Sequence, residues 1–188
     1  PIPYYRAKAT VERIVEDADV SHAILRPTLI YGRDDLLVNN LAWVLRRTPI
    51  FAVFGDGSYR VQPVFVGDVA DIAVTEGAST EGHTLNVAGP ETLTFEAFLR
   101  VLIRELGVKC RLVHAPPRVA HVGVRALEFL LRDVILTWDE TRGLMDDLLT
   151  TDTEPRGTTR FDDWLSEHAD ELGTHYTSYH ERYDPSAT

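Results

Sequence analysis

Two side chains near the start of the chain have the types and the spacing to exchange a proton with a ligand. Tyr4 stands four residues before Lys8, beside a run from Arg6 to Ala18 whose apolar residues recur at helical spacing. Residues four apart on a helix are neighbours, so the Lys8 ammonium can lie close to the Tyr4 phenol. A positive charge there favours the phenolate and lowers the pKa of the tyrosine from its ordinary value of about 10. The pair is therefore a candidate general acid/base, and the alternative is a surface tyrosine packed on a lysine side chain.

Composition limits the classes of partner. The 19 Lys and Arg residues are outnumbered by 29 Asp and Glu, which gives a formal net charge of −10. Proteins that bind nucleic acids present basic surfaces to the phosphates, so we expect no nucleic-acid partner for this acidic chain. The chain has no apolar run of the roughly 20 residues that a membrane-spanning helix needs, and no signal segment opens it. We therefore expect no membrane span and a cytoplasmic location.

The elements that would position the pair follow from the apolar pattern. Residues 22–25 form a short apolar run closed by Arg26-Pro27, where proline lacks the N–H that a strand needs, and a turn at Tyr31-Gly32 follows. A strand that feeds a loop at its carboxyl end is where open α/β sheets bind ligands. Residues 22–26 and 83–87 each precede a loop and a helix, so we expect them to be parallel strands of one sheet.

The rest of the chain alternates in the same way. Asp68, Thr94 and Thr159 are candidate helix caps, because their side-chain oxygens can accept from N–H groups that have no partner within the helix. The Asp-Gly step within 55–58 predicts a turn between two strands. Helices are expected at 36–47, 68–76, 94–106 and 119–131 and after 159, and strands at 50–54, 61–66 and 109–113.

Neither cysteine nor histidine indicates a metal site. The single Cys110 lies in an expected strand, where a buried thiol is the ordinary case. His168, His175 and His180 are spaced by seven and five residues, which does not gather a ligand set on one helical face, so we expect no metal.

Five short motifs follow one another over roughly residues 3–107. They are Tyr4-x-x-x-Lys8, Leu25-Arg26-Pro27-x-x-x-Tyr31-Gly32, Gly55-x-Gly57, Gln62-Pro63-Val64-x-Val66-x-Asp68-Val69-Ala70 and Asn86-Val87-Ala88-Gly89-Pro90-Glu91. Their order and spacing resemble the second half of an extended or atypical short-chain dehydrogenase/reductase. The Gln62-Pro63-Val64 stretch looks most like the branch that contains the nucleotide-binding accessory subunit of respiratory complex I.

The resemblance implies roles for particular residues. Tyr4 would be the catalytic acid/base, and Lys8 would lower its pKa while holding the nicotinamide ribose hydroxyls. Backbone groups of Pro27, Thr28 and Leu29 would lie near the carboxamide of NAD or NADP. Nucleotide-sugar epimerases carry an arginine where this chain has Val61, which argues against a nucleotide-sugar substrate.

Other parts of the family pattern are absent from the sequence. No strand, glycine-rich phosphate turn and helix come first, and the catalytic Ser or Thr upstream of the tyrosine is missing. The resemblance therefore predicts the carboxyl-terminal part of a doubly wound Rossmann-type α/β sheet with a small α+β substrate lobe. Residues 1–149 would form this part, 150–158 a linker and 159–188 a helical tail. A preceding segment or a homo-oligomer partner would cover the sheet edge.

These features favour a part of an NAD(P)-dependent oxidoreductase or epimerase-like enzyme acting on a small molecule. The alternative is a non-catalytic nucleotide-binding or assembly subunit, and an inert truncated product is the third possibility. In each case the phosphate-binding half of the cofactor site would have to come from outside this sequence.

Overall fold

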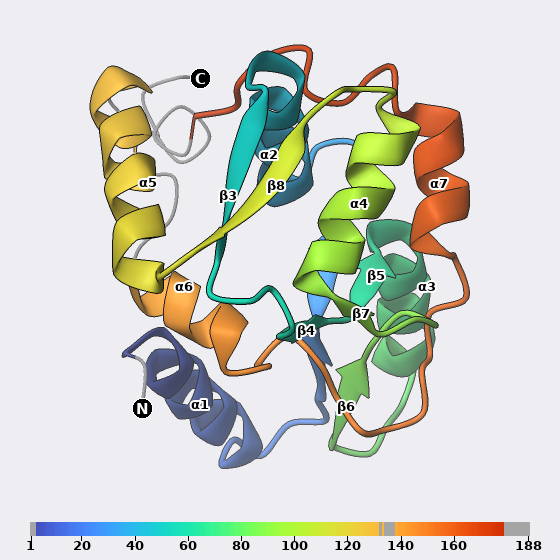
Figure 1. The fold of residues 1–188 in the computed structure, drawn as a ribbon. Helices are drawn as coiled ribbons and strands as arrows, with labels where there is room; N and C mark the ends of the chain where they lie inside the picture. The colour runs from blue at the N-terminus through green and yellow to red at the C-terminus, as the bar shows by residue number, and fades with distance from the viewer. Residues whose placement is uncertain (1–2, 132, 134–137, 179–188) are drawn as a thin grey trace.

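The computed structural model describes residues 3–131, 133 and 138–178 (Figure 1). The chain belongs to the α/β class, as predicted. Its helices are α1 (Pro3–Glu16), α2 (Leu36–Arg47), α3 (Val66–Gly77), α4 (Phe95–Glu105), α5 (Pro117–Leu131), α6 (Trp138–Met145) and α7 (Phe161–His168). Its strands are β1 (Ala23–Pro27), β2 (Leu29–Tyr31), β3 (Ile50–Phe54), β4 (Arg60–Val61), β5 (Pro63–Phe65), β6 (His83–Val87), β7 (Leu93–Thr94) and β8 (Arg111–Ala115).

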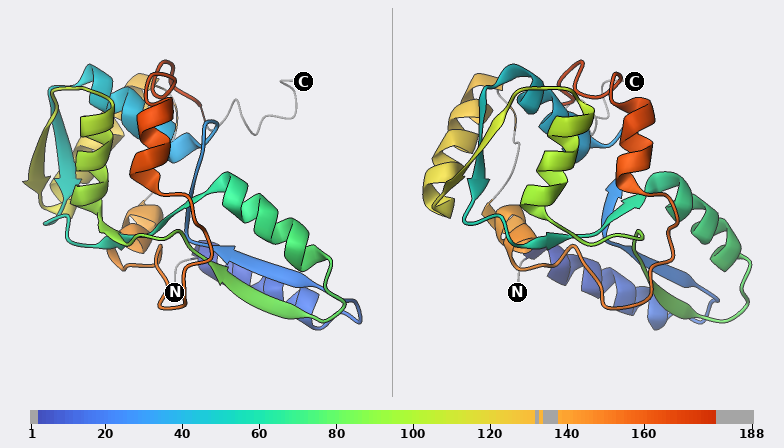
Figure 2. Two further views of the ribbon diagram at one scale, coloured as in Figure 1. Left: turned by 90° about the vertical axis from the view of Figure 1, so that its right-hand side faces the viewer. Right: turned by 45° about the vertical axis from the view of Figure 1, so that its right-hand side comes forward.

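The strands pair two by two. The pairs β1–β6, β2–β5 and β3–β8 are parallel, and β4–β7 is antiparallel. The β1–β6 register runs from Ala23 opposite His83 to Pro27 opposite Val87, which confirms the predicted parallel pairing of these two runs. Figure 2 shows α1 and α3 on opposite sides of this pair. Within the described ranges the pair has no third strand, so β1 presents an open edge.

The turn at 55–58 forms where predicted, but the strands on either side of it do not pair with each other. Gly55 and Gly57 adopt positive φ values of 61° and 71°, and the Ser58 N–H donates to the Asp56 carboxylate at 2.9 Å. Contacts with the start of α4 redirect the chain, because the Phe95 and Glu96 N–H groups donate to carbonyl oxygens of this loop. The predicted strand 61–66 is consequently divided between β4 and β5, and β3 pairs with β8 instead.

Helix positions follow the local signals closely. Helix α2 has the predicted bounds, and the Asp35 carboxylate accepts from the Val38 N–H at 2.6 Å. Helix α4 begins after Thr94, whose hydroxyl accepts from the Ala97 N–H at 3.1 Å as predicted. The strand expected at 109–113 is β8, two residues later, so Cys110 precedes it. Partial burial raises the pKa of the Cys110 thiol.

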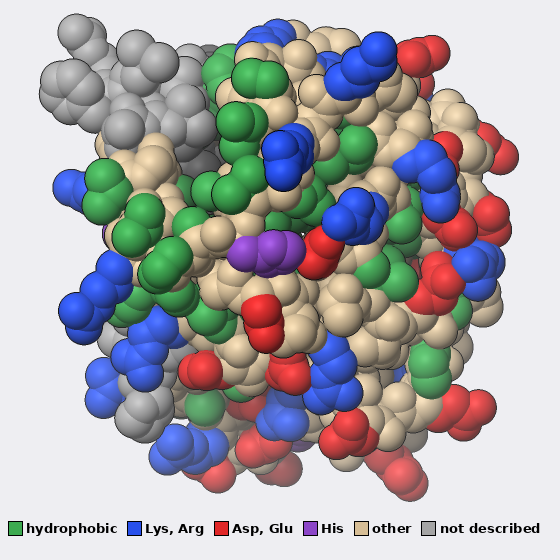
Figure 3. All heavy atoms as spheres, viewed as in Figure 1, with side chains coloured by type: hydrophobic (Ala, Val, Ile, Leu, Met, Phe, Trp, Pro, Cys, Tyr) green, Lys and Arg blue, Asp and Glu red, His purple; other side chains and the backbone are tan. Residues whose placement is uncertain are grey.

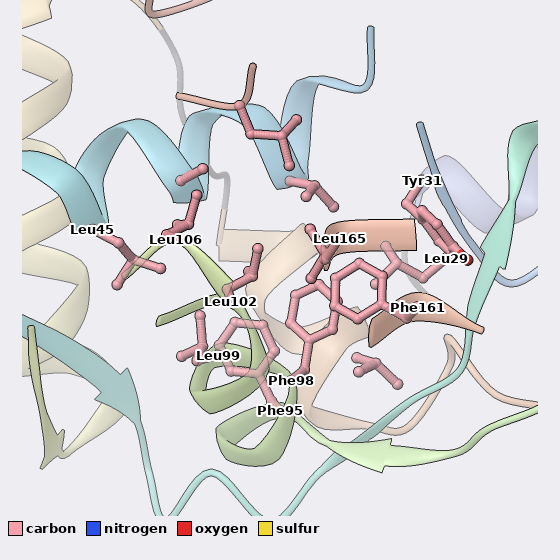
Figure 4. Packing of buried hydrophobic residues seen from close by; sticks show 14 of the residues in the cluster. Leu29, Tyr31, Leu45, Phe95, Phe98, Leu99, Leu102, Leu106, Phe161 and Leu165 are labelled. Carbon is pink, nitrogen blue, oxygen red and sulfur yellow. The ribbon is translucent and has the colours of Figure 1, made fainter. Parts of the chain in front are cut away.

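One hydrophobic core joins α2, α4 and α7 (Figure 4). Aromatic rings meet at its centre, since Phe161 of α7 lies 4.7 Å from Phe98 of α4 and 4.9 Å from Tyr31 at the end of β2 between ring centroids. All three side chains are at most 2% exposed. The helix expected after 159 is α7, and this core docks it onto the body of the protein. Of the helices described, none is long and apolar enough to span a membrane.

Candidate functional site

Tyr4 and Lys8, the candidate proton-transfer pair, lie on α1. Tyr4 belongs to the first turn of this helix and Lys8 follows one turn later, as the spacing predicts. The Tyr4 side chain is outside the described residues, and Lys8 is exposed. The apolar stripe of the same helix also faces outward, with Val11 58% and Ile14 65% exposed. Helix α1 therefore carries both a candidate reactive pair and an apolar face that the described residues leave open.

An ion pair connects α1 to β1. The Arg26 guanidinium, on β1, contacts the Glu12 carboxylate with 2.5 Å between Nη2 and Oε2 and donates to it from Nε as well. These hydrogen bonds hold the pKa of Glu12 below its ordinary value. The helix that bears Tyr4 and Lys8 is thereby fastened to the strand that leads into Pro27.

Residues 27–29 form a corner between two strand pairs. Strand β1 ends at Pro27, β2 begins at Leu29, and Thr28 between them donates its N–H to Val87 O at 3.0 Å. The Thr28 hydroxyl donates to Gln62 O at 2.5 Å, and the Leu29 N–H donates to the same oxygen at 3.4 Å. The N–H groups of this corner are therefore engaged within the fold, and Pro27 has none. A ligand carboxamide that reached the corner would find no free backbone donor on Thr28 or Leu29.

Asp68 and Thr159 do not act as the helix caps that the sequence predicts. Phe65 is the cap residue of α3 and Arg160 that of α7, each without a side-chain cap bond. The Asp68 carboxylate lies in the first turn of α3, where the helix dipole favours it, but it accepts from Thr158 N at 2.7 Å, Thr159 N at 2.8 Å and the Thr159 hydroxyl at 2.9 Å. These three hydrogen bonds tie the segment before α7 to α3. They satisfy the Asp68 carboxylate better than a single cap bond would.

Replacing Asp68 by Asn should lower the free energy of unfolding by about 1–3 kcal/mol, because the amide loses the charge and one of the two acceptor oxygens. Urea denaturation measures the change. Asp71→Asn is the matched control, since Asp71 is an exposed carboxylate on the same helix. Equal losses in the two variants would contradict the assignment of Asp68 as the tie between α3 and the segment before α7.

A pocket of about 570 Å³ lies between the start of α5 and α6. Arg118 and Arg142 line it together with the Asp146 carboxylate and the Trp138 ring. Two arginines and one aspartate among the lining residues suit an anionic group, and the Trp138 ring, Met145 and the prolines at 116 and 117 give the rest of the lining an apolar surface. Figure 3 shows Lys and Arg side chains gathered on this part of the surface in a protein of net charge −10.

Neither this pocket nor helix α6 was predicted from the sequence. The helix begins close to the N-terminal end of α1 in the views of Figures 1 and 2, so the pocket lies on the same side of the molecule as the start of the Tyr4 helix. One signal was available: Trp138, Arg142 and Asp146 recur every four residues, which is the spacing of one helical face.

The histidines have local partners. His168 stacks on Trp164 with 4.6 Å between ring centroids, and His175 lies 3.1 Å from the Thr174 hydroxyl. His180 is outside the described residues. Among the residues that the structure describes, no group of three or more His, Cys, Asp or Glu side chains could hold a metal ion.

Comparison with known proteins places this fold among Rossmann-type α/β proteins. Two solved structures resemble it: a UDP-glucose 4-epimerase from Thermotoga maritima (TM-score 0.58, 20% identity, 89% of this chain and 50% of that one) and a dTDP-4-dehydrorhamnose reductase from Bacillus anthracis (TM-score 0.55, 16% identity, 63% and 43%). At these identities the likeness shows the fold alone. No family model matches the chain.

Sequence relatives agree with the resemblance drawn from the motifs. NADH dehydrogenase 1 alpha subcomplex subunit 9, a mitochondrial protein of Arabidopsis thaliana, is 26% identical over 81% of this chain and 40% of its own length. Festuclavine dehydrogenase of Aspergillus fumigatus is 28% identical over 61% of this chain and 37% of its own length. These findings confirm the resemblance to the extended short-chain dehydrogenase/reductases and to the complex I subunit. The chain spans about two fifths of the length of these relatives.

Proposed function

We propose that this chain is the catalytic and substrate-binding part of an NAD(P)-dependent oxidoreductase or epimerase of the short-chain dehydrogenase type. The observation that carries the proposal is the arrangement around α1. Tyr4 and Lys8 lie one turn apart on a helix that an ion pair fastens to β1, and β1 ends at the corner of residues 27–29. Lys8 would bind the ribose hydroxyls of the nicotinamide and lower the pKa of Tyr4, which would exchange the substrate proton. The nicotinamide of the cofactor would give or take the hydride.

The substrate would enter beside α6. The pocket with Arg118 and Arg142 suits a small molecule that carries an anionic group. Val61 stands where, by the resemblance, nucleotide-sugar epimerases carry an arginine. It is fully buried and uncharged, so it cannot bind the phosphates of such a substrate. This supports a substrate other than a nucleotide sugar.

The cofactor phosphates would be bound outside residues 1–188. The glycine turn at 55–58 leads into β4 rather than into a helix whose N-terminus could hold a phosphate. The open edge of β1 and the exposed Val11 and Ile14 of α1 offer the surface on which a further parallel strand and helix would pack. A preceding segment of a longer protein is the occupant we favour, and a homo-oligomer partner is the alternative. We include a cytoplasmic location in this proposal.

A non-catalytic nucleotide-binding or assembly subunit is the second candidate. It is favoured by the match to the complex I subunit, which covers 81% of this chain. The two candidates differ in what Tyr4 does, because only the enzyme needs its proton.

Calorimetric titration with NADH and NADPH tests the proposal. Residues 1–188 alone should bind neither cofactor, or bind in the millimolar range, because their sequence has no glycine-rich phosphate turn. A protein that includes the phosphate-binding half should bind in the micromolar range. Micromolar binding by residues 1–188 alone would show that the phosphates are held within this chain. No binding by the longer protein would refute the cofactor proposal.

A further inference from the structure

Gln62 lies where four segments of the chain meet at the carboxyl ends of β1 and β6. It stands between β4 and β5, so it is the residue at which the chain passes from one strand pair to another. It is 3% exposed, which is unusual for a glutamine. A buried amide of this kind is costly unless its hydrogen-bonding groups are satisfied, so its partners define its role.

Every polar group of Gln62 has a partner. The backbone N–H donates to Leu149 O at 3.0 Å, and the backbone oxygen accepts from the Thr28 hydroxyl at 2.5 Å and from the Leu29 N–H. The side-chain Nε2 donates to Gly89 O at 3.0 Å, and Oε1 accepts from the Thr151 N–H at 3.2 Å. One residue thus holds the corner after β1, the loop after β6 and the segment after α6 together.

Gly89 allows this arrangement. A Cβ at this position would lie 1.8 Å from Pro63 O, so only glycine lets the loop after β6 approach the start of β5 so closely. The approach brings the Gly89 carbonyl within reach of the Gln62 amide. The two backbones and the amide therefore form one rigid contact beside Thr28.

We propose that Gln62 is a positioning residue for the nicotinamide end of the cofactor site. It acts through the corner of residues 27–29. Its backbone oxygen accepts the hydrogen bonds that fix the corner, and its side chain binds the loop after β6 beside it. This inference rests on the proposed function, since it assumes that the corner faces the nicotinamide. It gives the Gln62-Pro63-Val64 motif a physical role that the sequence pattern alone does not supply.

Two substitutions separate positioning from general stability. Gln62→Met keeps the shape of the side chain but removes its donor and acceptor, which frees Gly89 O and the Thr151 N–H. Asn39→Leu is the matched control, because Asn39 is also a buried amide, 5% exposed, with hydrogen bonds to His175, Thr177 and Gly173. These partners hold α2 to the segment after α7, away from the corner. Gln62→Glu, which keeps the acceptor, serves if the methionine variant does not fold.

The first measurement is amide hydrogen exchange in residues 1–188. We expect exchange at Thr28 and Leu29 to rise about tenfold or more in the Gln62 variant, because the loss of both side-chain hydrogen bonds loosens the residue whose backbone oxygen holds the corner. Exchange at both amides should stay at the wild-type rate in Asn39→Leu. Unchanged exchange at both amides would overturn the inference, whatever the cofactor does.

The second measurement is steady-state kinetics of the cofactor-binding protein, by which we mean the longer protein that joins residues 1–188 to the phosphate-binding half. The KM for the cofactor should rise about tenfold in the Gln62 variant with little change in kcat, because the corner moves and Tyr4 does not, and Asn39→Leu should leave both near wild type. Faster exchange with an unchanged KM would overturn the positioning role. If the wild-type protein binds no cofactor, the proposed function fails, and hydrogen exchange still decides whether Gln62 fixes the corner.

Discussion

Replacing Tyr4 by Phe in the cofactor-binding protein is expected to lower turnover by roughly 10²–10⁴-fold while cofactor affinity stays nearly unchanged. That range is the usual loss when a positioned acid/base is removed, and the phenyl ring keeps the packing of the phenol. The pH profile of kcat should also lose the limb that reports the tyrosine, since no phenol remains to titrate. Steady-state kinetics over a range of pH measures both effects.

Two further variants make this prediction specific. Tyr5→Phe is the matched control, because Tyr5 is the next residue of the same helix and is 37% exposed, and it should leave turnover within a few fold of wild type. Lys8→Met should raise the KM for the cofactor and lower kcat, because one ammonium serves the ribose hydroxyls and the phenol. If Tyr4→Phe leaves turnover and its pH profile unchanged with an active substrate, the non-catalytic subunit becomes the better account.

Phe161→Ala is expected to have the largest effect on stability, a loss of about 3–5 kcal/mol in the free energy of unfolding. Phe161 is 2% exposed, and its ring packs between those of Phe98 and Tyr31. The Tyr31 hydroxyl donates to Thr159 O at 3.1 Å, so the same contacts fasten the start of α7. Burial raises the pKa of Tyr31 above its ordinary value, so this donor stays protonated into the alkaline range.

Urea denaturation of Phe161→Ala and of Val74→Ala measures the difference. Val74 is 78% exposed on α3, so its truncation should change the free energy of unfolding by less than about 0.5 kcal/mol. A loss below about 1 kcal/mol for Phe161→Ala would contradict the single core that joins α7 to α4. It would instead support a loose attachment of α7 to the rest of the protein.

Elements specified by local signals could be predicted from the sequence. Helix α2 has its apolar stripe and a capping carboxylate within one turn, so its bounds match the prediction. The β1–β6 pair was predicted because each apolar run precedes a loop and a helix, which is a local sign of parallel topology. Helix α6 was missed because its apolar side chains stand only at its two ends, at Trp138 and at Leu144 and Met145, and so make no apolar stripe.

Features that depend on distant partners could not be predicted. Asp68 and Thr159 each match a local capping pattern, yet they bind each other across 91 positions of sequence, and that contact replaces both caps. The pairing of β3 with β8 is equally non-local, because the turn after β3 suggested a neighbour along the chain. The pocket at α6 arises only when α5 and α6 come together, so the roles of Arg118 and Arg142 had no sequence signal of their own beyond the spacing along α6.

Titration of the 15N-labelled cofactor-binding protein with NADH tests the central claim most directly. The amide resonances of Tyr4, Lys8, Thr28 and Leu29 should shift on binding, because these residues would surround the nicotinamide ribose and carboxamide. The amide of Asn39, on α2, should stay in place. NADH that binds with micromolar affinity and leaves the amides of α1 and of the corner unshifted would contradict the claim that this chain holds the nicotinamide.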